Sequence, residues 1–285
     1  MTGWPEHYGE ALTLASEVET RGTGLHSGLE ARVRLGPWDR PGYWLGWLDE
    51  PDTPPQRLSP AQVVETTLCT ALQLGGRRLA TVEHLLAALA GCGVTQALIL
   101  VEGGELPLLD GSALPWVELL ASAGLRSLGR SAPLTPLRRA LTVHGAGGFV
   151  TAVPADRLEL GAAIVFREAA IGRQMLALPL SPAVFVKEIA PARTFGLRSQ
   201  VEQLRAAGLI QGGGLDNALV CDGDRWLNPP LRFVDEPARH KILDLMGDLA
   251  LAGLPSAQVF AYRGSHRLHT ELAAALAAEP APLPA

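Results

Sequence analysis

The segment 236–253, EPARHKILDLMGDLALAG, constrains the fold of this chain more than any other stretch. On a helical wheel its aliphatic side chains fall on one broad arc, whereas His240, Asp244 and Asp248 gather on the opposite side. The pattern predicts a helix that packs through one face and carries chemistry on the other. Because His240 and Asp244 are one turn apart, their side chains can converge on a single metal ion.

A third metal ligand has to come from another part of the fold, because two side chains do not make a tight zinc site. The segment TVEHLLAALAG, residues 81–91, predicts a second helix over 82–90 that carries His84 next to Glu83. Taken alone, His84 is more often a hydrogen-bonded core histidine, and His240 with Asp244 is more often a surface ion pair. A neighbouring carboxylate and imidazole in apolar surroundings are, however, costly to bury without a purpose.

We therefore predict a metal centre made of His84, His240 and Asp244. Two imidazoles and one carboxylate fit Zn²⁺ and, as the less favoured alternative, Fe²⁺. Such a set leaves a coordination position for water, which a metal ion makes nucleophilic at neutral pH. The polar residues expected close to this centre are Glu83, Lys241, Asp248 and His266.

The length of 285 residues favours two domains, each large enough to bury a core. Residues 129–136, GRSAPLTP, predict a linker between an N-terminal domain, 1–128, and a C-terminal domain, 137–278. The end of the chain, 279–285, is expected to be a disordered tail. Each half ends as helix, strand, helix with a histidine-bearing helix in place, which suggests an internal duplication, although the halves share few identical residues.

Hydrophobic periodicity predicts the other elements. Alternation over 11–18 and 29–37, around the glycine-rich turn 21–28, predicts a hairpin with His26 as a turn residue. The Pro- and Trp-rich span 38–60 should be irregular or a short edge strand, and 59–74 should be a helix that Gly75 ends. Strands are also expected at 77–80, 94–101, 140–143, 148–153, 157–166, 218–221, 225–227 and 257–261, an irregular piece at 167–179, and helices at 113–123, 181–188, 199–207 and 269–277.

Composition excludes several classes of protein. The net charge is −5, the pI is near 5.8 and long runs of Lys or Arg are missing, which argues against a nucleic-acid partner. The sequence has neither an apolar run of membrane-spanning length nor a secretory start, so we expect a soluble cytoplasmic protein without a transmembrane segment. Cys69, Cys92 and Cys221 are few, scattered and set in apolar sequence, which suits reduced core thiols.

Seven segments of the chain resemble the UDP-3-O-acyl-N-acetylglucosamine deacetylases of lipid A biosynthesis. They occur in the family's order and span nearly the whole chain, and such a combination is highly specific. The segments are GTGLHSG (22–28), TTLCTAL (66–72), TVEHLLAALAG (81–91), ELPLLDGSALP (105–115), ARTFG (192–196), LDNALV (215–220) and LRFVDEPARHKILDLMGDL (231–249).

The resemblance implies an α+β fold of two similar domains, each a sheet with packed helices, with the two helix layers sandwiched between the sheets. It also implies a zinc amidohydrolase that removes acetate from a UDP-linked, 3-O-acylated N-acetylglucosamine. His84, His240 and Asp244 would be the zinc ligands. The implied catalytic residues are Glu83 as general base, Thr194 as the hydroxyl at the oxyanion, His266 as the acid for the departing amine, Asp248 as its support, and Lys241 as a substrate contact.

For substrate binding, the resemblance implies that Phe195 stacks near the uracil or sugar and that Arg263 faces phosphate. The acyl chain would lie in an apolar passage around 164–178 and 201–214, which includes Val201 and Gly213. Departures from the family pattern are Arg263-Gly264-Ser265 before His266, where Lys-Ser-Gly is usual, Leu197 in place of a common aromatic residue, and the lack of a His-Pro pair within 167–179.

Two other functions stay open at this stage. One is a metal-dependent amidohydrolase that acts on another nucleotide sugar or acylated amine. The other is a non-catalytic relative that only binds a UDP-sugar lipid, which is disfavoured because every position that the mechanism needs holds the required residue type. We expect a monomer whose only small-molecule partner is the UDP-linked acylated glucosamine.

Overall fold

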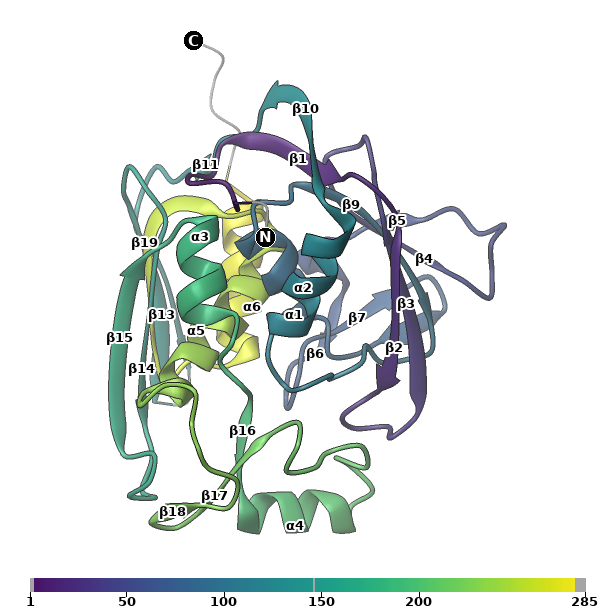
Figure 1. The fold of residues 1–285 in the computed structure, drawn as a ribbon. Coiled ribbons are helices and arrows are strands. Elements are labelled where there is room, and N and C mark those ends of the chain that lie inside the picture. The colour runs from purple at the N-terminus through teal and green to yellow at the C-terminus, as the bar shows by residue number, and fades with distance from the viewer. Residues whose placement is uncertain (1–2, 146, 280–285) are drawn as a thin grey trace.

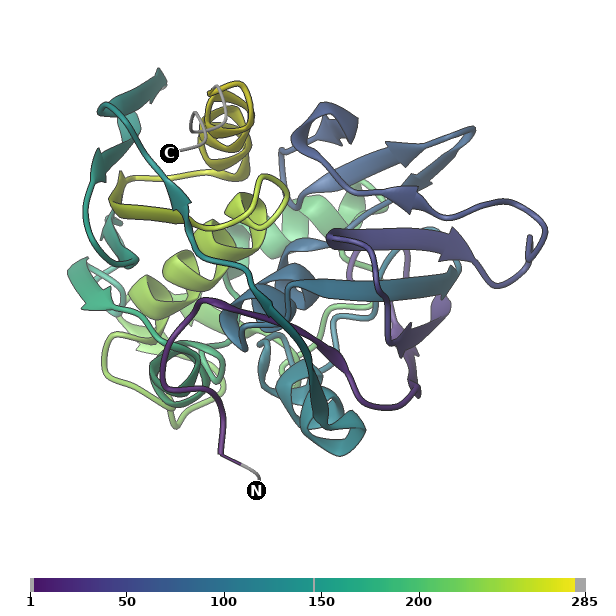
Figure 2. The ribbon, with the colours of Figure 1, turned by 90° about the horizontal axis from the view of Figure 1, so that it is seen from above.

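Two β-sheets form the outer layers of the molecule, and most of the helices lie between them (Figure 1). The structure is a computed structural model and describes residues 3–145 and 147–279. Seen from above, the helices separate the two sheets (Figure 2). This arrangement confirms the predicted α+β fold with helices sandwiched between sheets.

The two large sheets repeat one topology. The first has the strand order β2-β3-β9-β4-β5, and the second has the order β12-β13-β19-β14-β15. In each sheet the central strand pairs antiparallel on one side and parallel on the other. The strands are β2 Val18–Thr23, β3 Glu30–Gly36, β4 Gly42–Trp47, β5 Gln56–Arg57 and β9 Gln96–Glu102, and β12 Leu141–Gly145, β13 Gly148–Pro154, β14 Glu159–Val165, β15 Arg173–Pro179 and β19 Pro255–Tyr262.

The main helices are also repeated. Helix α1 (Glu83–Gly91) leads into β9 and α2 (Leu114–Ala123) follows it; α5 (Glu236–Leu249) leads into β19 and α6 (His266–Ala277) follows it. The two histidine-bearing helices therefore occupy equivalent places in the two halves, where they pack against each other. The predicted sequence of helix, strand, helix at the end of each half is confirmed.

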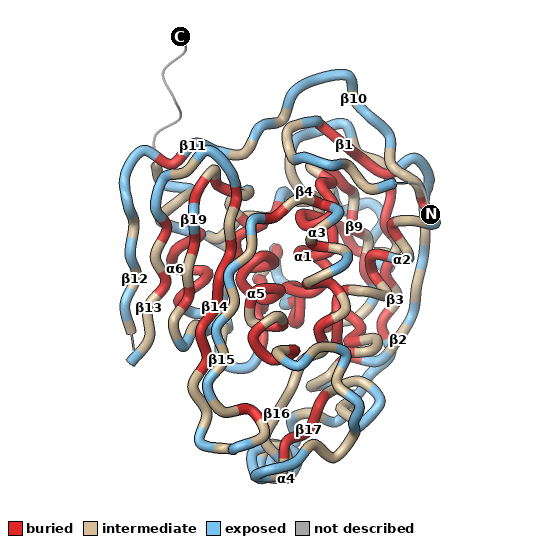
Figure 3. The backbone as a smooth tube through the Cα atoms, turned by 60° about the vertical axis from the view of Figure 1, so that its left-hand side comes forward, coloured by how far each residue is buried: buried red, intermediate tan, exposed pale blue. Residues whose placement is uncertain are grey.

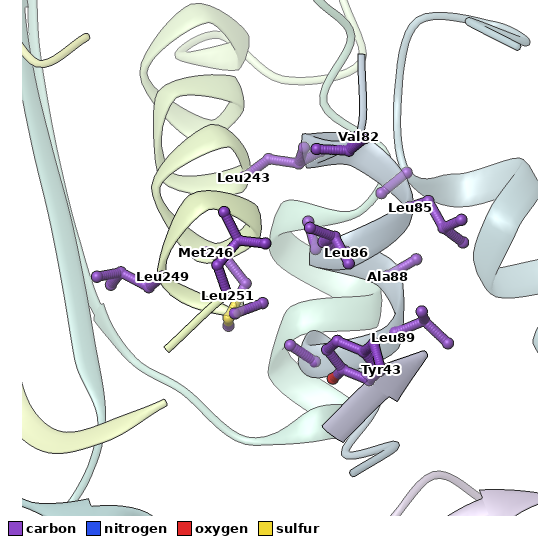
Figure 4. Packing of buried hydrophobic residues seen from close by; sticks show 14 of the residues in the cluster. Tyr43, Val82, Leu85, Leu86, Ala88, Leu89, Leu243, Met246, Leu249 and Leu251 are labelled. Carbon is purple, nitrogen blue, oxygen red and sulfur yellow. The ribbon is translucent and has the colours of Figure 1, made fainter. Parts of the chain in front are cut away.

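The core is concentrated on the contact between α1 and α5 (Figure 3). Every residue of α1 is buried, so this helix is surrounded by protein on all sides. Leu243 and Met246 of α5 face Val82, the residue just before α1, and Leu86 of α1 (Figure 4). Burial of each large aliphatic side chain contributes about 1.5–3 kcal/mol, so this contact holds the two halves together.

Smaller elements extend each half. In the sequence, a small three-stranded sheet is inserted between β5 and α1. A second three-stranded sheet, together with helix α4, precedes α5 in the sequence. The second group forms the lower end of the molecule in Figure 1. The first sheet consists of β6 Val63–Glu65, β7 Ala71–Leu74 and β8 Arg77–Leu79, and the second group consists of β16 Phe195–Leu197, α4 Arg198–Ala206, β17 Leu219–Asp222 and β18 Arg225–Trp226. Two more pairings are β1 Glu10–Leu14 with β10 Leu125–Ser131 and β11 Thr135–Pro136 with β19. Short helical turns cover Pro60–Gln62, Pro182–Val184 (α3) and Phe185–Ile189.

The helix predicted over 59–74 is wrong. The span contains a short helical turn and then β6 and β7, and β7 pairs with β8 as a hairpin. Gly75 has a φ of 60°, so it forms the hairpin turn and does not end a helix. The β-branched pair Val63-Val64 and the alternation that buries Leu72 and Leu74 favour strands.

Three other expectations need correction. The span 38–60 contains β4, an inner strand whose Tyr43, Leu45 and Trp47 alternate into the core, so it is more than an irregular edge. The span 167–179 is not wholly irregular, because β15 pairs with β14 along its length. The hairpin consists of β2 and β3, whereas β1 is a separate strand that pairs with β10.

We propose that the domain boundary falls in the linker 129–136, between domains 1–128 and 137–278. The chain leaves β10, which pairs with β1, and enters β11, which pairs with β19 of the other half. Of the predicted disordered tail 279–285, Glu279 is described and accepts from Arg139, and the rest lies outside the described residues. Within the described part of the chain, no helix combines the length and apolar character needed to cross a membrane.

Candidate active site

Three buried side chains from α1 and α5 converge on one point. Oδ1 of Asp244 lies 3.3 Å from Nε2 of His240 and 3.8 Å from Nε2 of His84. One ligand atom of each residue lies within 4.8 Å of the other two, which suits three ligands of a single ion. The predicted trio is therefore assembled, although its members come from both halves of the chain.

The donor chemistry of this trio fits a divalent metal ion. Nδ1 of His240 donates to the carbonyl oxygen of Ala192 at 3.0 Å, which leaves the Nε2 lone pair directed at the centre. Burial lowers the pKa of His240, and burial and the neighbouring His240 lower that of His84 to about 3, so both rings are neutral. Burial alone would raise the pKa of Asp244, but Lys241 and His240 hold it well below its usual range.

One nitrogen of the trio has no hydrogen-bond partner in the part of the chain that the structure describes. This atom is Nδ1 of His84, which is buried in a side chain that is only 5% exposed. An ion at Nε2 would not partner this nitrogen, so the fit to a metal rests on the two neutral Nε2 atoms and the ionised carboxylate of Asp244. The residues present therefore fit the metal that the sequence predicts.

Beside the trio, Glu83 and His266 face each other. Oε1 of Glu83 lies 3.9 Å from Nε2 of His266, and both side chains are largely buried. The other oxygen of Glu83 accepts the backbone N–H of Thr70 at 3.0 Å. His266 donates through Nδ1 to Oδ2 of Asp248 at 2.9 Å. A carboxylate and an imidazole are thus held in fixed positions next to the metal ligands.

The surroundings adjust the acidity of this pair. Burial raises the pKa of Glu83 to about 7, with His266 opposing the rise and Asp248 adding to it. Burial would lower the pKa of His266, but the charge and hydrogen bond of Asp248 raise it to about 9. A group that can accept a proton and a group that can donate one therefore coexist near neutral pH.

Close approach of the two helices brings these groups together. A Cβ at Gly247 of α5 would lie 2.0 Å from the carbonyl oxygen of Glu83. Real Cβ atoms do not come so close, so only glycine allows the helices to pack at this distance. Gly247 therefore sets the separation between Glu83 and the residues of α5, although sequence reasoning assigned it no role.

Two further predicted site residues lie where the chain enters β16, Thr194 just before the strand and Phe195 as its first residue. Thr194 donates its backbone N–H to Gly111 at 2.7 Å and follows Ala192, the partner of His240. The ring of Phe195 lies 6.4 Å from that of His240. Nζ of Lys241 lies 5.6 Å from the centre of the Phe195 ring and also donates to Oδ2 of Asp244 at 2.8 Å.

The remaining predicted substrate residues lie farther out. Arg263 is exposed, and its guanidinium lies near Gly147 in the turn between β12 and β13. Val201 and Gly213 line a cavity of about 240 Å³ beneath α4. Its other lining residues include Ile210, Leu215, Val220 and Leu227. The structure therefore brings together the residues predicted to hold the metal and to transfer protons, and these three predicted substrate residues are not part of that cluster.

Two acidic side chains connect the segments in which the sequence resembles the deacetylase family. Glu105 accepts the backbone N–H groups of His26 and Ser27 and the hydroxyl of Thr81, at 2.8–3.0 Å. The fully buried Glu236 accepts the backbone N–H and guanidinium of Arg193, the residue that follows the partner of His240 in the chain. Buried carboxylates therefore tie these segments together.

Sequence reasoning missed two polar residues at the centre. The hydroxyl of Thr70 donates to Oδ1 of Asp248 at 2.5 Å, and Nδ1 of His269 lies 3.0 Å from Oδ2 of the same carboxylate. His269 could have been found from its spacing, since it follows His266 by three residues on one face of α6. The helix was predicted to begin at 269, whereas α6 begins at His266, so the sequence did not place the two histidines on the same helix.

Comparisons with known proteins agree with the resemblance. The model of the family described as UDP-3-O-acyl N-acetylglycosamine deacetylase matches residues 11–278. A protein from Trichormus variabilis named UDP-3-O-acyl-N-acetylglucosamine deacetylase is 47% identical over 268 residues, covering 92% of this chain and 96% of that protein. A protein of the same name from Thermosynechococcus vestitus is 46% identical over 269 residues, covering 93% of each chain.

A plant protein is also similar. The Arabidopsis thaliana protein named "Probable UDP-3-O-acyl-N-acetylglucosamine deacetylase 1, mitochondrial" is 40% identical over 283 residues, covering 92% of this chain and 86% of its own. The stretch that the family model matches spans both halves of the chain and contains the positions of all three residues of the metal trio. This chain therefore belongs to the UDP-3-O-acyl N-acetylglycosamine deacetylase family.

Proposed function

We propose that this chain hydrolyses the N-acetyl group of UDP-3-O-acyl-N-acetylglucosamine, an early committed step of lipid A biosynthesis. The products are acetate and UDP-3-O-acyl-glucosamine. The observation that carries the proposal is the meeting of a metal-ligand trio with the Glu83–His266 pair in one buried centre. An amide needs an activated water, a trap for the oxyanion and an acid for the nitrogen, and this centre offers residues for each task.

Zinc is the metal that we propose for His84, His240 and Asp244, with Fe²⁺ as the alternative. Two neutral imidazoles and a carboxylate are typical ligands of a catalytic zinc ion that keeps one position open. When bound, the ion supplies Lewis-acid chemistry, which acidifies water and polarises the amide carbonyl. The hydrogen bond from His240 to Ala192 supports this assignment, because such outer contacts orient ligating histidines.

Glu83 is the proposed general base and His266 the proposed general acid. As the water oxygen bonds to the amide carbon, one water proton passes to the Glu83 carboxylate. The C–N bond then breaks, and the amine nitrogen takes the Nε2 proton of His266 as it leaves. The backbone N–H of Thr70 orients Glu83, and the carboxylate of Asp248 keeps His266 protonated for this transfer.

Two further side chains are assigned to the same step. The hydroxyl of Thr194 would donate a hydrogen bond to the oxyanion that forms on the carbonyl oxygen. Lys241 would contact the substrate while its bond to Asp244 keeps that ligand ionised. Thr194 lies two residues after Ala192, whose carbonyl oxygen accepts from the proposed ligand His240, and this position supports its assignment to the oxyanion.

Substrate recognition is assigned to the residues around the centre. Phe195 would stack near the uracil or sugar, and Arg263 would approach the phosphates. The cavity lined by Val201 and Gly213 has an apolar lining in part, which suits an acyl chain. All three proposed ligands belong to one chain, so the centre needs no second copy, and we propose a monomer. The three free buried cysteines fit a reducing compartment, so we propose that it acts in the cytoplasm.

The test is release of acetate from UDP-3-O-acyl-N-acetylglucosamine by the purified protein, before and after chelation and again with stoichiometric zinc. We expect turnover that disappears with the chelator and returns with zinc. A folded, zinc-loaded protein that releases no acetate would point to another amide substrate. A folded protein that neither binds zinc nor releases acetate would instead fit a non-catalytic binding relative.

A further inference from the structure

The carboxylate of Asp248 is shared by donors from one helix, α6, and from the loop before β7. Its Oδ1 accepts the hydroxyl of Thr70 at 2.5 Å, and its Oδ2 lies 2.9 Å from Nδ1 of His266 and 3.0 Å from Nδ1 of His269. Asp248 is fully buried and His269 is 1% exposed. Because an ionised carboxylate only accepts hydrogen bonds, both imidazoles donate through Nδ1. Two rings of α6 therefore compete for one oxygen.

The position of Nε2 of His269 bears on one departure from the family pattern, the glycine at 264. Its Nε2 lies 2.5 Å from the position that a Cβ at residue 264 would occupy. Nε2 is buried and has no hydrogen-bond partner among the described residues. The sequence has glycine at 264, where the family usually has serine, with the glycine one place later. Gly264 does not need a left-handed backbone, since its φ is not positive. A Cβ there would also lie 3.0 Å from Cβ of Ala261, so His269 is the closer of the two side chains that favour glycine here.

We propose that His269 is a positioning residue for His266: its Nδ1–H holds the shared Asp248 oxygen, and glycine at 264 makes room for its ring. The inference rests on the proposed function, in which His266 gives its proton to the leaving amine. His269 does not touch the reacting atoms and acts only through Asp248. The three charged groups that face His266 are Asp248 and Asp244 of α5 and Glu83 of α1.

The hydrogen bond from His269 has a definite electrostatic consequence. Its N–H dipole points its positive end at Oδ2 and stabilises the negative charge of Asp248. That contact weakens the attraction between Asp248 and the proton of His266. Removal of the donor therefore makes His266 a weaker acid. It also leaves Oδ2 of Asp248 with a single hydrogen-bond donor, His266, among these residues.

Two substitutions at 269 separate the donor from the ring. In His269→Asn, the side-chain amide nitrogen takes the place of Nδ1, and no atom remains at the Nε2 position. In His269→Phe, the ring is kept and the donor is lost. We expect His269→Asn to retain kcat within about threefold and His269→Phe to lose about tenfold or more, with KM changed less than about twofold in both. The alkaline limb of the pH profile of His269→Phe should move to higher pH.

A second pair of variants tests the space at 264. Gly264→Ala pushes a methyl group into the His269 ring, so it should lower kcat and the unfolding temperature. The double variant Gly264→Ala with His269→Asn should recover most of both, because Asn has no atom at the Nε2 position and only the 3.0 Å contact with Cβ of Ala261 remains. His144→Asn, at an exposed position on β12, is the matched control and should resemble the parent protein.

Several results would overturn the inference. The first is a His269→Phe enzyme that keeps the kcat and the alkaline limb of the parent, or whose alkaline limb moves to lower pH. The second is an equal loss of kcat in His269→Phe and His269→Asn. The third is a loss of kcat and unfolding temperature in Gly264→Ala that His269→Asn does not relieve. Failure of the proposed function is distinguishable, because the parent protein would then release no acetate. The coupling between 264 and 269 would still be measurable from the unfolding temperatures of the four proteins.

Discussion

Oε1 of Glu83 and Nε2 of His266 lie 3.9 Å apart, although the first belongs to α1 and the second to α6 of the other half. The negative and positive forms of the pair stabilise each other, and Asp248 holds His266 from behind. The base and the acid are therefore poised in opposite protonation states before substrate arrives. The same distance makes the two groups a coupled pair, so their titrations are properties of the site.

The first prediction concerns pH. Activity requires Glu83 without its proton and His266 with one, so kcat/KM should follow a bell. The pKa of Glu83, raised to about 7, places the rising limb near or below that pH, because a bound cation would lower it. The pKa of His266, raised to about 9, places the falling limb on the alkaline side. Initial rates measured from about pH 5 to about pH 10 test both limbs.

The control is the His266→Ala variant, which should lose the falling limb as well as most of its rate. If the falling limb persists unchanged in this variant, another group supplies the acid. In that case the bond between His266 and Asp248 serves structure alone.

The second prediction separates the base from the metal ligands. Glu83→Gln keeps the size of the side chain but cannot accept the proton of the attacking water. We expect kcat to fall by about 10²–10⁴-fold, with metal content unchanged. Metal content measured by mass spectrometry alongside turnover distinguishes loss of the base from loss of the ion. Full activity in Glu83→Gln would contradict the assignment of Glu83.

The third prediction concerns the trio itself. His84→Ala or Asp244→Ala removes one of three ligands, so metal and activity should be lost together. His144→Ala, at an exposed position on β12, is the matched control and should keep both. A variant of either ligand that retains stoichiometric metal and normal turnover would show that the ion is bound elsewhere.

The periodic segments of the sequence predicted the fold well where one physical signal dominated. The apolar arc of 236–253 gave α5 its buried face, and the helix, strand, helix order of each half matches the repeated topology of the two sheets. The helix predicted over 59–74 failed because Ser59, Pro60 and Gly75 have the chemistry of helix ends, while the pairing of β7 with β8 decides the structure. Local capping signals do not report such pairing.

The site shows the same division. Helical spacing placed His240 with Asp244, and the second histidine helix supplied His84, but the distances between helices depend on residues without polar chemistry. Gly247 fixes the separation of α1 and α5, and no periodic pattern reveals that a glycine faces a carbonyl oxygen on another helix. The donors to Asp248 were similarly hidden, because Thr70 comes from a segment that was expected to be helical.

The last prediction tests this close approach. Gly247→Ala places a methyl carbon where 2.0 Å separates it from the carbonyl oxygen of Glu83, so α1 and α5 must move apart. We expect a loss of about 1–3 kcal/mol in the free energy of unfolding, together with a fall in kcat, because Glu83 and His84 both shift with α1. Gly76→Ala is the matched control, since a Cβ there meets no atom within 4 Å and its φ is not positive. Chemical denaturation and acetate release measure the two effects. If Gly247→Ala is as stable and active as Gly76→Ala, the helix contact tolerates a Cβ, and the separation of the two halves is set by other residues.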